Sequence, residues 1–89
     1  MKLFIVRNER DFEDIFVVGV CGSREDAIAL CRDCYEEFEK RTGKSGYDAD
    51  RANYMLKDFR ESLTIETALL GVKLKERAVK VSYQELLDR

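Results

Sequence analysis

A continuous apolar run near the N-terminus constrains the fold more than any other feature of this sequence. Residues 15–21 read Ile-Phe-Val-Val-Gly-Val-Cys, a run that is too short for a typical helix and rich in β-branched side chains. This pattern predicts a strand that is buried on both faces. Residues 3–7 form a weakly alternating apolar segment, and the polar residues 8–11 that follow are typical of a turn. We therefore expect an N-terminal β-hairpin.

The segment after this run has the pattern of an amphipathic helix, predicted over residues 24–41. Ser23 is suited to cap its first turn, and Gly43 is suited to end it. Apolar side chains recur at spacings of three and four, as on the buried stripe of a helix. These side chains are Ala27, Cys31, Cys34, Tyr35 and Phe38. The stripe predicts a helix that packs against the hairpin.

The remaining elements are shorter. They are a second helix capped by Asp48 or Asp50 and ending near residue 60, strands over residues 63–69 and 78–81, and a last short helix that begins with a capping box at Ser82. The order is therefore β-β-α-α-β-β-α. It predicts a single α+β domain over residues 1–89, with an antiparallel sheet of about four strands and helices packed on one face.

Length and charge favour a non-enzymatic protein. A chain of 89 residues buries only roughly 60–65% of the surface that it exposes when unfolded, so a deep catalytic cleft would remove scarce core volume. The chain has no His, the side chain best suited to proton transfer near neutral pH. Its net charge of −2 lacks the basic excess of most nucleic-acid-binding proteins.

The cysteines Cys21, Cys31 and Cys34 allow two interpretations. Cys31 and Cys34 form a C-x-x-C pair that, joined by Cys21, could hold zinc or act as a redox pair. Both also fall on the apolar stripe, where core packing is the simpler explanation, so no cofactor is predicted. An odd number of cysteines, together with the absence of a signal-peptide pattern or a long apolar segment, predicts a cytoplasmic protein with free thiols.

A group of aromatic and charged residues is the best candidate for a partner-binding site. Tyr47, Arg51, Tyr54 and Asp58 are spaced so that they share one face of the second predicted helix, beside its apolar face. Tyrosine and arginine are enriched at the energetic centres of protein interfaces. The alternative is that the two tyrosines simply cover the edge of the core.

A basic stretch late in the chain leaves a second functional class open. It contains Lys73, Lys75, Arg77 and Lys80 and could bind nucleic acid. No aromatic residue lies among these bases to stack on a nucleotide, which counts against a single-strand-binding groove. A solvated strand edge protected by lysines explains the same pattern.

The N-terminal part of the sequence resembles a type of short, uncharacterised phage and bacterial accessory protein. The matching segments are Met1-Lys2-Leu3-Phe4-Ile5-Val6, then Val18-Gly19-Val20, then Ser23 and Ala27 at the start of the helix, and Ile65-Glu66-Thr67-Ala68-Leu69 later on. The segment over residues 47–60 departs from the simplest form of that type. The resemblance implies a β-hairpin followed by a Ser-capped helix, and a phage-encoded modulator or inhibitor of a host protein.

These observations together predict a protein-interaction module whose partner is another protein. A second copy of the chain is a further expected partner. Because Val17 and Gly19 alternate with Val18 and Val20, strand periodicity places apolar residues on both faces. The following helix covers one face, and we expect a sister copy or a foreign surface to cover the other.

Overall fold

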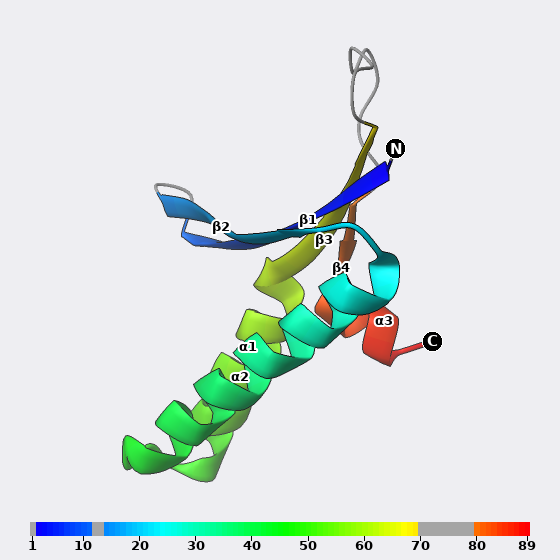
Figure 1. The fold of residues 1–89 in the computed structure, drawn as a ribbon. Coiled ribbons are helices and arrows are strands. Elements are labelled where there is room, and N and C mark those ends of the chain that lie inside the picture. Colours follow the sequence, from blue (N-terminus) through cyan, green and yellow to red (C-terminus); the bar gives the residue numbers. More distant parts are fainter. Residues whose placement is uncertain (1, 12–13, 70–79) are drawn as a thin grey trace.

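A computed structural model describes residues 2–11, 14–69 and 80–89 of the chain. They form a four-stranded antiparallel sheet with three helices packed against one side of it (Figure 1). The α+β class, the element order β-β-α-α-β-β-α and the antiparallel sheet predicted from sequence are confirmed. The elements are β1 (Lys2–Asp11), β2 (Asp14–Cys21), α1 (Arg24–Lys44), α2 (Ala49–Ser62), β3 (Leu63–Leu69), β4 (Lys80–Ser82) and α3 (Tyr83–Leu87).

The order of strands in the sheet is β2-β1-β3-β4, so β1 lies between two partners and β2 forms a long edge. Val6 of β1 lies opposite Gly19 of β2 and Ile65 of β3, and all three face the helices. The core is formed between this face of the sheet and the helices. Its buried residues are Val6, Ala27, Cys31, Phe59, Leu63, Ile65 and Tyr83.

Two predicted boundaries in the sheet are wrong or only partly described. Residues 8–11 belong to β1 and not to a turn, because Asn8 pairs with Phe16 on one side and with Leu63 on the other. Backbone pairing on both sides holds Asn8 in the strand, and Asp11 pairs with Asp14 of β2, which the composition of these residues alone does not indicate. β4 runs from Lys80 to Ser82, and the earlier part of the predicted strand lies outside the described residues.

The prediction that β2 is buried on both faces is also wrong for the single chain. Val17 and Val20 are each 57% exposed. The ladder has a β-bulge at Val18, so that Val17 pairs with Arg7 and Gly19 pairs with Val6. The extra residue shifts the period-two alternation and places Val17 and Val20 on the same face, the one opposite to Gly19.

Helix α1 is longer than its sequence predicts. Ser23 caps it as expected, its hydroxyl accepting a hydrogen bond from the Asp26 amide, but the helix continues through Gly43 to Lys44. The chain reverses instead at Gly46, whose φ of 73° lies in the left-handed region that glycine adopts most readily. Of the two predicted caps of α2, the structure selects Asp48, which accepts a hydrogen bond from the Arg51 amide.

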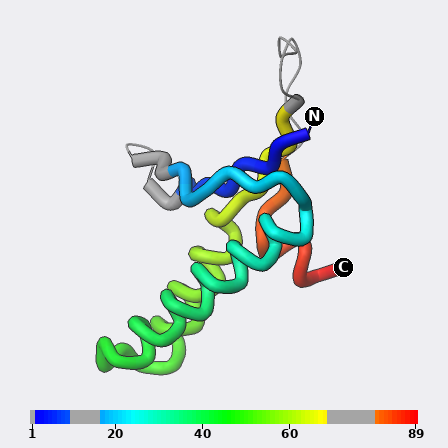
Figure 2. The backbone as a smooth tube through the Cα atoms, viewed as in Figure 1, coloured from blue at the N-terminus to red at the C-terminus, as the bar shows by residue number. Residues whose placement is uncertain are grey.

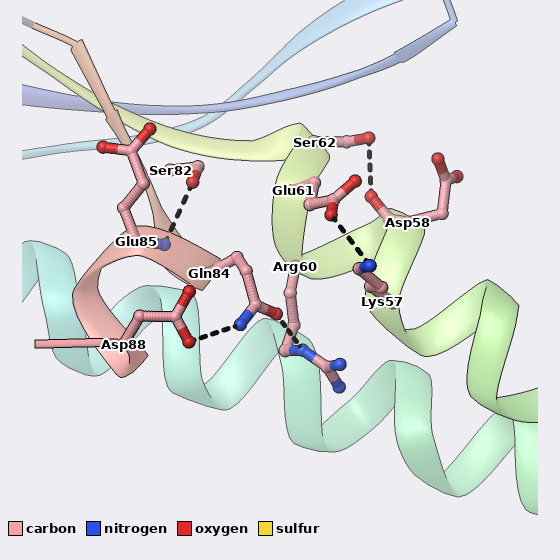
Figure 3. Close-up of polar contacts among 9 residues, drawn as sticks. All are labelled: Lys57, Asp58, Arg60, Glu61, Ser62, Ser82, Gln84, Glu85 and Asp88. Carbon is pink, nitrogen blue, oxygen red and sulfur yellow. Dashed lines mark hydrogen bonds and ion pairs between the residues drawn. The ribbon is translucent and has the colours of Figure 1, made fainter.

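Helices α1 and α2 form a hairpin that projects away from the sheet (Figure 2). The rings of Phe38 and Phe59 stack between them, with centroids 4.2 Å apart and planes 7° from parallel. At the sheet-proximal end, Arg60 of α2 donates a hydrogen bond to the side chain of Gln84 in α3 (Figure 3). The hairpin is therefore anchored at its base to α3 and presents its outer faces to solvent.

Candidate functional site

The Tyr–Arg row predicted on α2 consists of Tyr47, Arg51, Tyr54 and Asp58. Tyr47 and Tyr54 are 40% and 72% exposed, so most of the Tyr54 ring lies in solvent and covers little of the core edge. The structure brings Tyr47 and Arg51 into contact, with the Arg51 guanidinium carbon 5.0 Å from the centroid of the Tyr47 ring. Asp58, at the sheet-proximal end of the row, is half-buried.

The local structure explains why this row has a defined shape. Asp48, the residue between Tyr47 and the helix, caps α2 through a 2.8 Å bond from the Arg51 amide. This cap fixes the first turn and so fixes where Arg51 leaves the backbone. Cation–π attraction then holds the guanidinium against Tyr47. Tyr54 follows one turn later on the same side of the helix, with most of its ring in solvent.

A second surface lies on the side of the sheet that faces away from the described helices (Figure 1). We call it the open sheet face. It consists of Ile5, Arg7, Val17, Val20, Thr64 and Glu66, which the strand registers place side by side. Antiparallel sheets commonly carry polar residues on a solvated face. Here the β2 part of that face consists of Val17 and Val20, as the apolar run in the sequence predicts.

The centre of the open sheet face is polar and incompletely bonded. Arg7 and Glu66 form an ion pair of 3.1 Å, and both side chains are largely covered. Thr64, directly opposite Arg7, is only 5% exposed. Within the described part of the chain, Arg7 Nε and Thr64 Oγ1 are buried without a hydrogen-bond partner. Such groups carry a desolvation cost in the single chain.

Sequence reasoning did not find the group of Arg7, Thr64 and Glu66. Arg7 and Thr64 are far apart in the chain, and only the pairing of β1 with β3 brings them together. The one local signal was the alternation in residues 63–69, which places Thr64 and Glu66 on one face of a strand.

The three cysteines behave as core residues and not as an activated set. All three are free thiols, and Cys31 is completely buried. Burial, followed by the nearby Cys34 and Cys21, raises the pKa of Cys31 to about 12. Burial also raises the pKa of Cys34. Zinc ligands and redox nucleophiles are thiolates, which this environment disfavours, and no group of three candidate ligands suited to a metal occurs among the described residues.

Most of the predicted basic stretch, including Lys73, Lys75 and Arg77, lies outside the described residues. Lys80 is described, and its ammonium forms an ion pair with the carboxylate of Glu9 on β1. That pairing reduces what Lys80 could offer to a phosphate.

Comparison with family models, with curated proteins and with solved structures finds no match for this chain. Among the described helices, none combines the length and the apolar character that crossing a membrane requires.

Proposed function

We propose that this chain is a non-enzymatic protein-interaction module that binds another protein through the Tyr–Arg row. The observation that carries the proposal is the 72% exposure of Tyr54 one turn beyond Arg51, which lies against the ring of Tyr47. A large aromatic side chain in water gains free energy when a partner covers it. Tyrosine and arginine are also the side chains that most often dominate protein interfaces.

The position of the row supports the same proposal. It lies along α2 in a helical hairpin that projects from the sheet, so a partner reaches it without displacing other elements (Figure 2). The Asp48 cap and the Arg51–Tyr47 contact hold part of the row in place before binding. Preorganisation of this kind lowers the entropy cost of association.

The proposal extends to the class of partner. The resemblance of the N-terminal hairpin and Ser-capped helix to phage and bacterial accessory proteins supports a modulator or inhibitor of a host protein. The three free thiols support a cytoplasmic location, where a reducing environment keeps cysteines unpaired.

The test begins by identifying the partner directly. A photo-crosslinking residue placed at position 50, which is exposed and one turn before Tyr54, is expected to capture one host protein in the native cell. Binding of that purified protein is then measured for the wild type, Arg51→Ala and Tyr54→Ala. Each variant is expected to weaken affinity by about tenfold or more, as truncation of an interface hot spot does.

A matched control separates binding from folding. Asn53→Ala changes an exposed residue of the same helix on a different face and is expected to leave affinity within about twofold, as surface changes away from an interface do. Circular dichroism and urea unfolding check that all three variants keep the fold. Unchanged affinity in the Arg51→Ala, Tyr54→Ala double variant would remove the Tyr–Arg row as the binding site.

The open sheet face supports a second candidate, homodimerisation. Val17 and Val20 are each 57% exposed beside an incompletely bonded polar centre, and Arg7 and Glu66 provide both signs of charge. A two-fold interface places the same patch on both copies, so opposite charges within one patch are complementary to themselves. Light scattering is expected to give a dimeric mass for the wild type and a monomeric mass for Val17→Lys, Val20→Lys. A control, Glu25→Lys on exposed α1, stays dimeric. A monomeric wild type at high concentration rejects this candidate.

A further inference from the structure

A cavity of about 170 Å³ lies on the helix-bearing side of the sheet, away from both surfaces described above. It is partly open, and its lining comes from the sheet, the first residue of α1 and the C-terminal segment that contains α3. Its lining residues are Phe4, Arg24, Ile65, Thr67, Val81, Leu86 and Arg89. Four elements far apart in the sequence, β1, α1, β3 and β4, thus meet α3 and Arg89 around one opening.

The lining divides into an apolar part and a cationic part. The strands and α3 contribute aromatic and aliphatic side chains, namely Phe4, Ile65, Val81 and Leu86. Arg24 and Arg89 add two guanidinium groups from different walls, and Thr67 adds one hydroxyl. Both arginines are exposed to solvent overall.

Both arginines have acidic neighbours in the sequence, Glu25 and Asp26 after Arg24 and Asp88 before Arg89. Within the described residues, neither Arg24 nor Arg89 forms an ion pair or a side-chain hydrogen bond, although Arg7, Lys57 and Lys80 each have an acidic partner. Guanidinium groups bind carboxylates in a planar, bidentate arrangement. Two such groups beside an apolar floor are complementary to an anion joined to a hydrocarbon body.

The volume limits the size of that ligand. Pockets for drug-sized molecules measure roughly 300–1,000 Å³, well above the volume here. A nucleotide, with its base, sugar and phosphates, is therefore too large. A short aliphatic chain with one carboxylate fits both the volume and the division of the lining.

We propose that this cavity is a binding site for a carboxylate carried on a short apolar group. Arg24 and Arg89 bind the carboxylate, and the side chains of Phe4, Ile65, Val81 and Leu86 cover the hydrocarbon. This ligand chemistry has two sources: a free aliphatic carboxylic acid, or the C-terminal residue of a protein chain that ends in an apolar amino acid. The proposal stands independently of the Tyr–Arg row, since the two sites share no residue.

Ligand titrations monitored by the amide NMR signals of the protein test the proposal with four probes. Hexanoate is expected to give saturable shifts at Phe4, Thr67 and Val81. Hexanol supplies the same hydrocarbon without charge, and inorganic phosphate supplies charge without hydrocarbon, and each is expected to bind about tenfold or more weakly than hexanoate. A short peptide that ends in leucine, compared with its C-terminal amide, tests the chain-end source.

Substitutions that remove one charge at a time complete the test. Arg24→Gln and Arg89→Gln are each expected to weaken hexanoate binding by about tenfold, the effect of losing one charge-assisted hydrogen bond. Arg41→Gln, in the last turn of α1, removes the same charge at the far end of the hairpin and serves as the matched control. Its affinity is expected to equal that of the wild type.

The outcomes distinguish the proposal from its failure and one source from the other. Tighter binding of the leucine-ending peptide than of hexanoate, lost in the amide, supports a chain-end site. Binding of hexanoate without the peptide supports a small-molecule site. Three results would overturn the carboxylate site: no saturable shifts with either hexanoate or the leucine-ending peptide, binding of hexanol as tight as that of hexanoate, or wild-type affinity for hexanoate in both arginine variants.

Discussion

The guanidinium of Arg60 donates a 2.7 Å hydrogen bond to the hydroxyl of Tyr35 and thereby ties α2 to α1 at the base of the helical hairpin. The same guanidinium donates a 2.6 Å bond from Nε to Gln84 of α3. Tyr35 also packs near the rings of Phe59 and Tyr83. One partly buried arginine therefore joins all three helices, and the hairpin depends on it for its orientation on the sheet.

Replacement of Arg60 by Ala is expected to lower the free energy of unfolding by about 2 kcal/mol, because it removes two hydrogen bonds that involve a charged donor. Tyr35→Phe removes only one of them and is expected to cost about 1 kcal/mol. Urea unfolding measures both. Lys57→Ala is the control, since it breaks only the exposed 3.9 Å pair with Glu61 and should change stability by less than about 0.5 kcal/mol. Equal effects of Arg60→Ala and Lys57→Ala would contradict the role of Arg60.

Two glycines near the tip of the hairpin are expected to respond to alanine in opposite directions. Gly43 lies inside α1 with no atom near the position of a β-carbon, so Gly43→Ala should stabilise the protein by about 0.5–1 kcal/mol through helix propensity. Gly46 has a φ of 73°, and Gly46→Ala should destabilise it by about 1 kcal/mol because an L side chain is strained there. Thermal unfolding of the two variants checks the pair. The same sign for both would mean that the helix ends at Gly43, as the sequence alone indicated.

A second pair of glycines tests the contact between β2 and α1. A β-carbon on Gly19 would lie 2.7 Å from Cδ2 of Leu30, whereas one on Gly22 would meet nothing within 4 Å. Gly19→Ala forces Leu30 to move and is expected to cost about 1–2 kcal/mol, as overpacking does. Gly22→Ala is expected to be neutral or slightly stabilising. Urea unfolding measures the stability of both variants. If Gly19→Ala were as stable as Gly22→Ala, the contact between β2 and α1 would not be tight at Gly19.

Stability is expected to fall at alkaline pH because of Cys31. Its pKa is about 12 in the folded chain, raised by burial from 9.0. The contribution of the neutral Cys31 thiol to the free energy of unfolding is therefore fully present below about pH 9, where the folded and the unfolded chain both keep the proton. Between about pH 9 and pH 12 only the unfolded chain releases it, and the free energy of unfolding drops by up to about 1.4 kcal/mol per pH unit. Burial raises the pKa of Tyr83 as well, which acts in the same direction.

The Cys31→Ala variant isolates this effect. It is expected to be less stable than the wild type near neutral pH but to lose stability less steeply between about pH 9 and pH 11, because the thiol no longer titrates. Urea unfolding at several pH values compares the two slopes. Parallel slopes would exclude Cys31 as a source of the alkaline loss.

The parts of the structure that sequence could predict are those set by neighbours along the chain. The Ser23 cap with its apolar stripe, and the alternation that starts at Leu63, are local patterns, and the structure has both elements. The Tyr–Arg row is local in the same sense, because helix geometry brings Arg51 and Tyr54 to one face. Asp58 shares the spacing but lies half-buried, since burial depends on what packs against α2 and not on spacing.

The parts that sequence could not predict depend on contacts between distant segments. The bulge at Val18 changes which valines share a face, and it is defined only by the register between β1 and β2. The burial of Thr64 beside Arg7 requires the pairing of β1 with β3. The arginine-lined cavity needs residues from both ends of the chain. No periodicity within a single segment contains this information.

The central place of β1 in the sheet has a consequence for how the chain folds. β1 and β2 are adjacent in sequence and can pair within microseconds, whereas two helices separate β3 from β1 along the chain. Since α1 and α2 double back on each other, they return the chain to the sheet and shorten the loop that must close. The helical hairpin would then bring β3 close to β1 during folding. Substitutions that destabilise the contact between α1 and α2 should therefore slow refolding more than they speed unfolding.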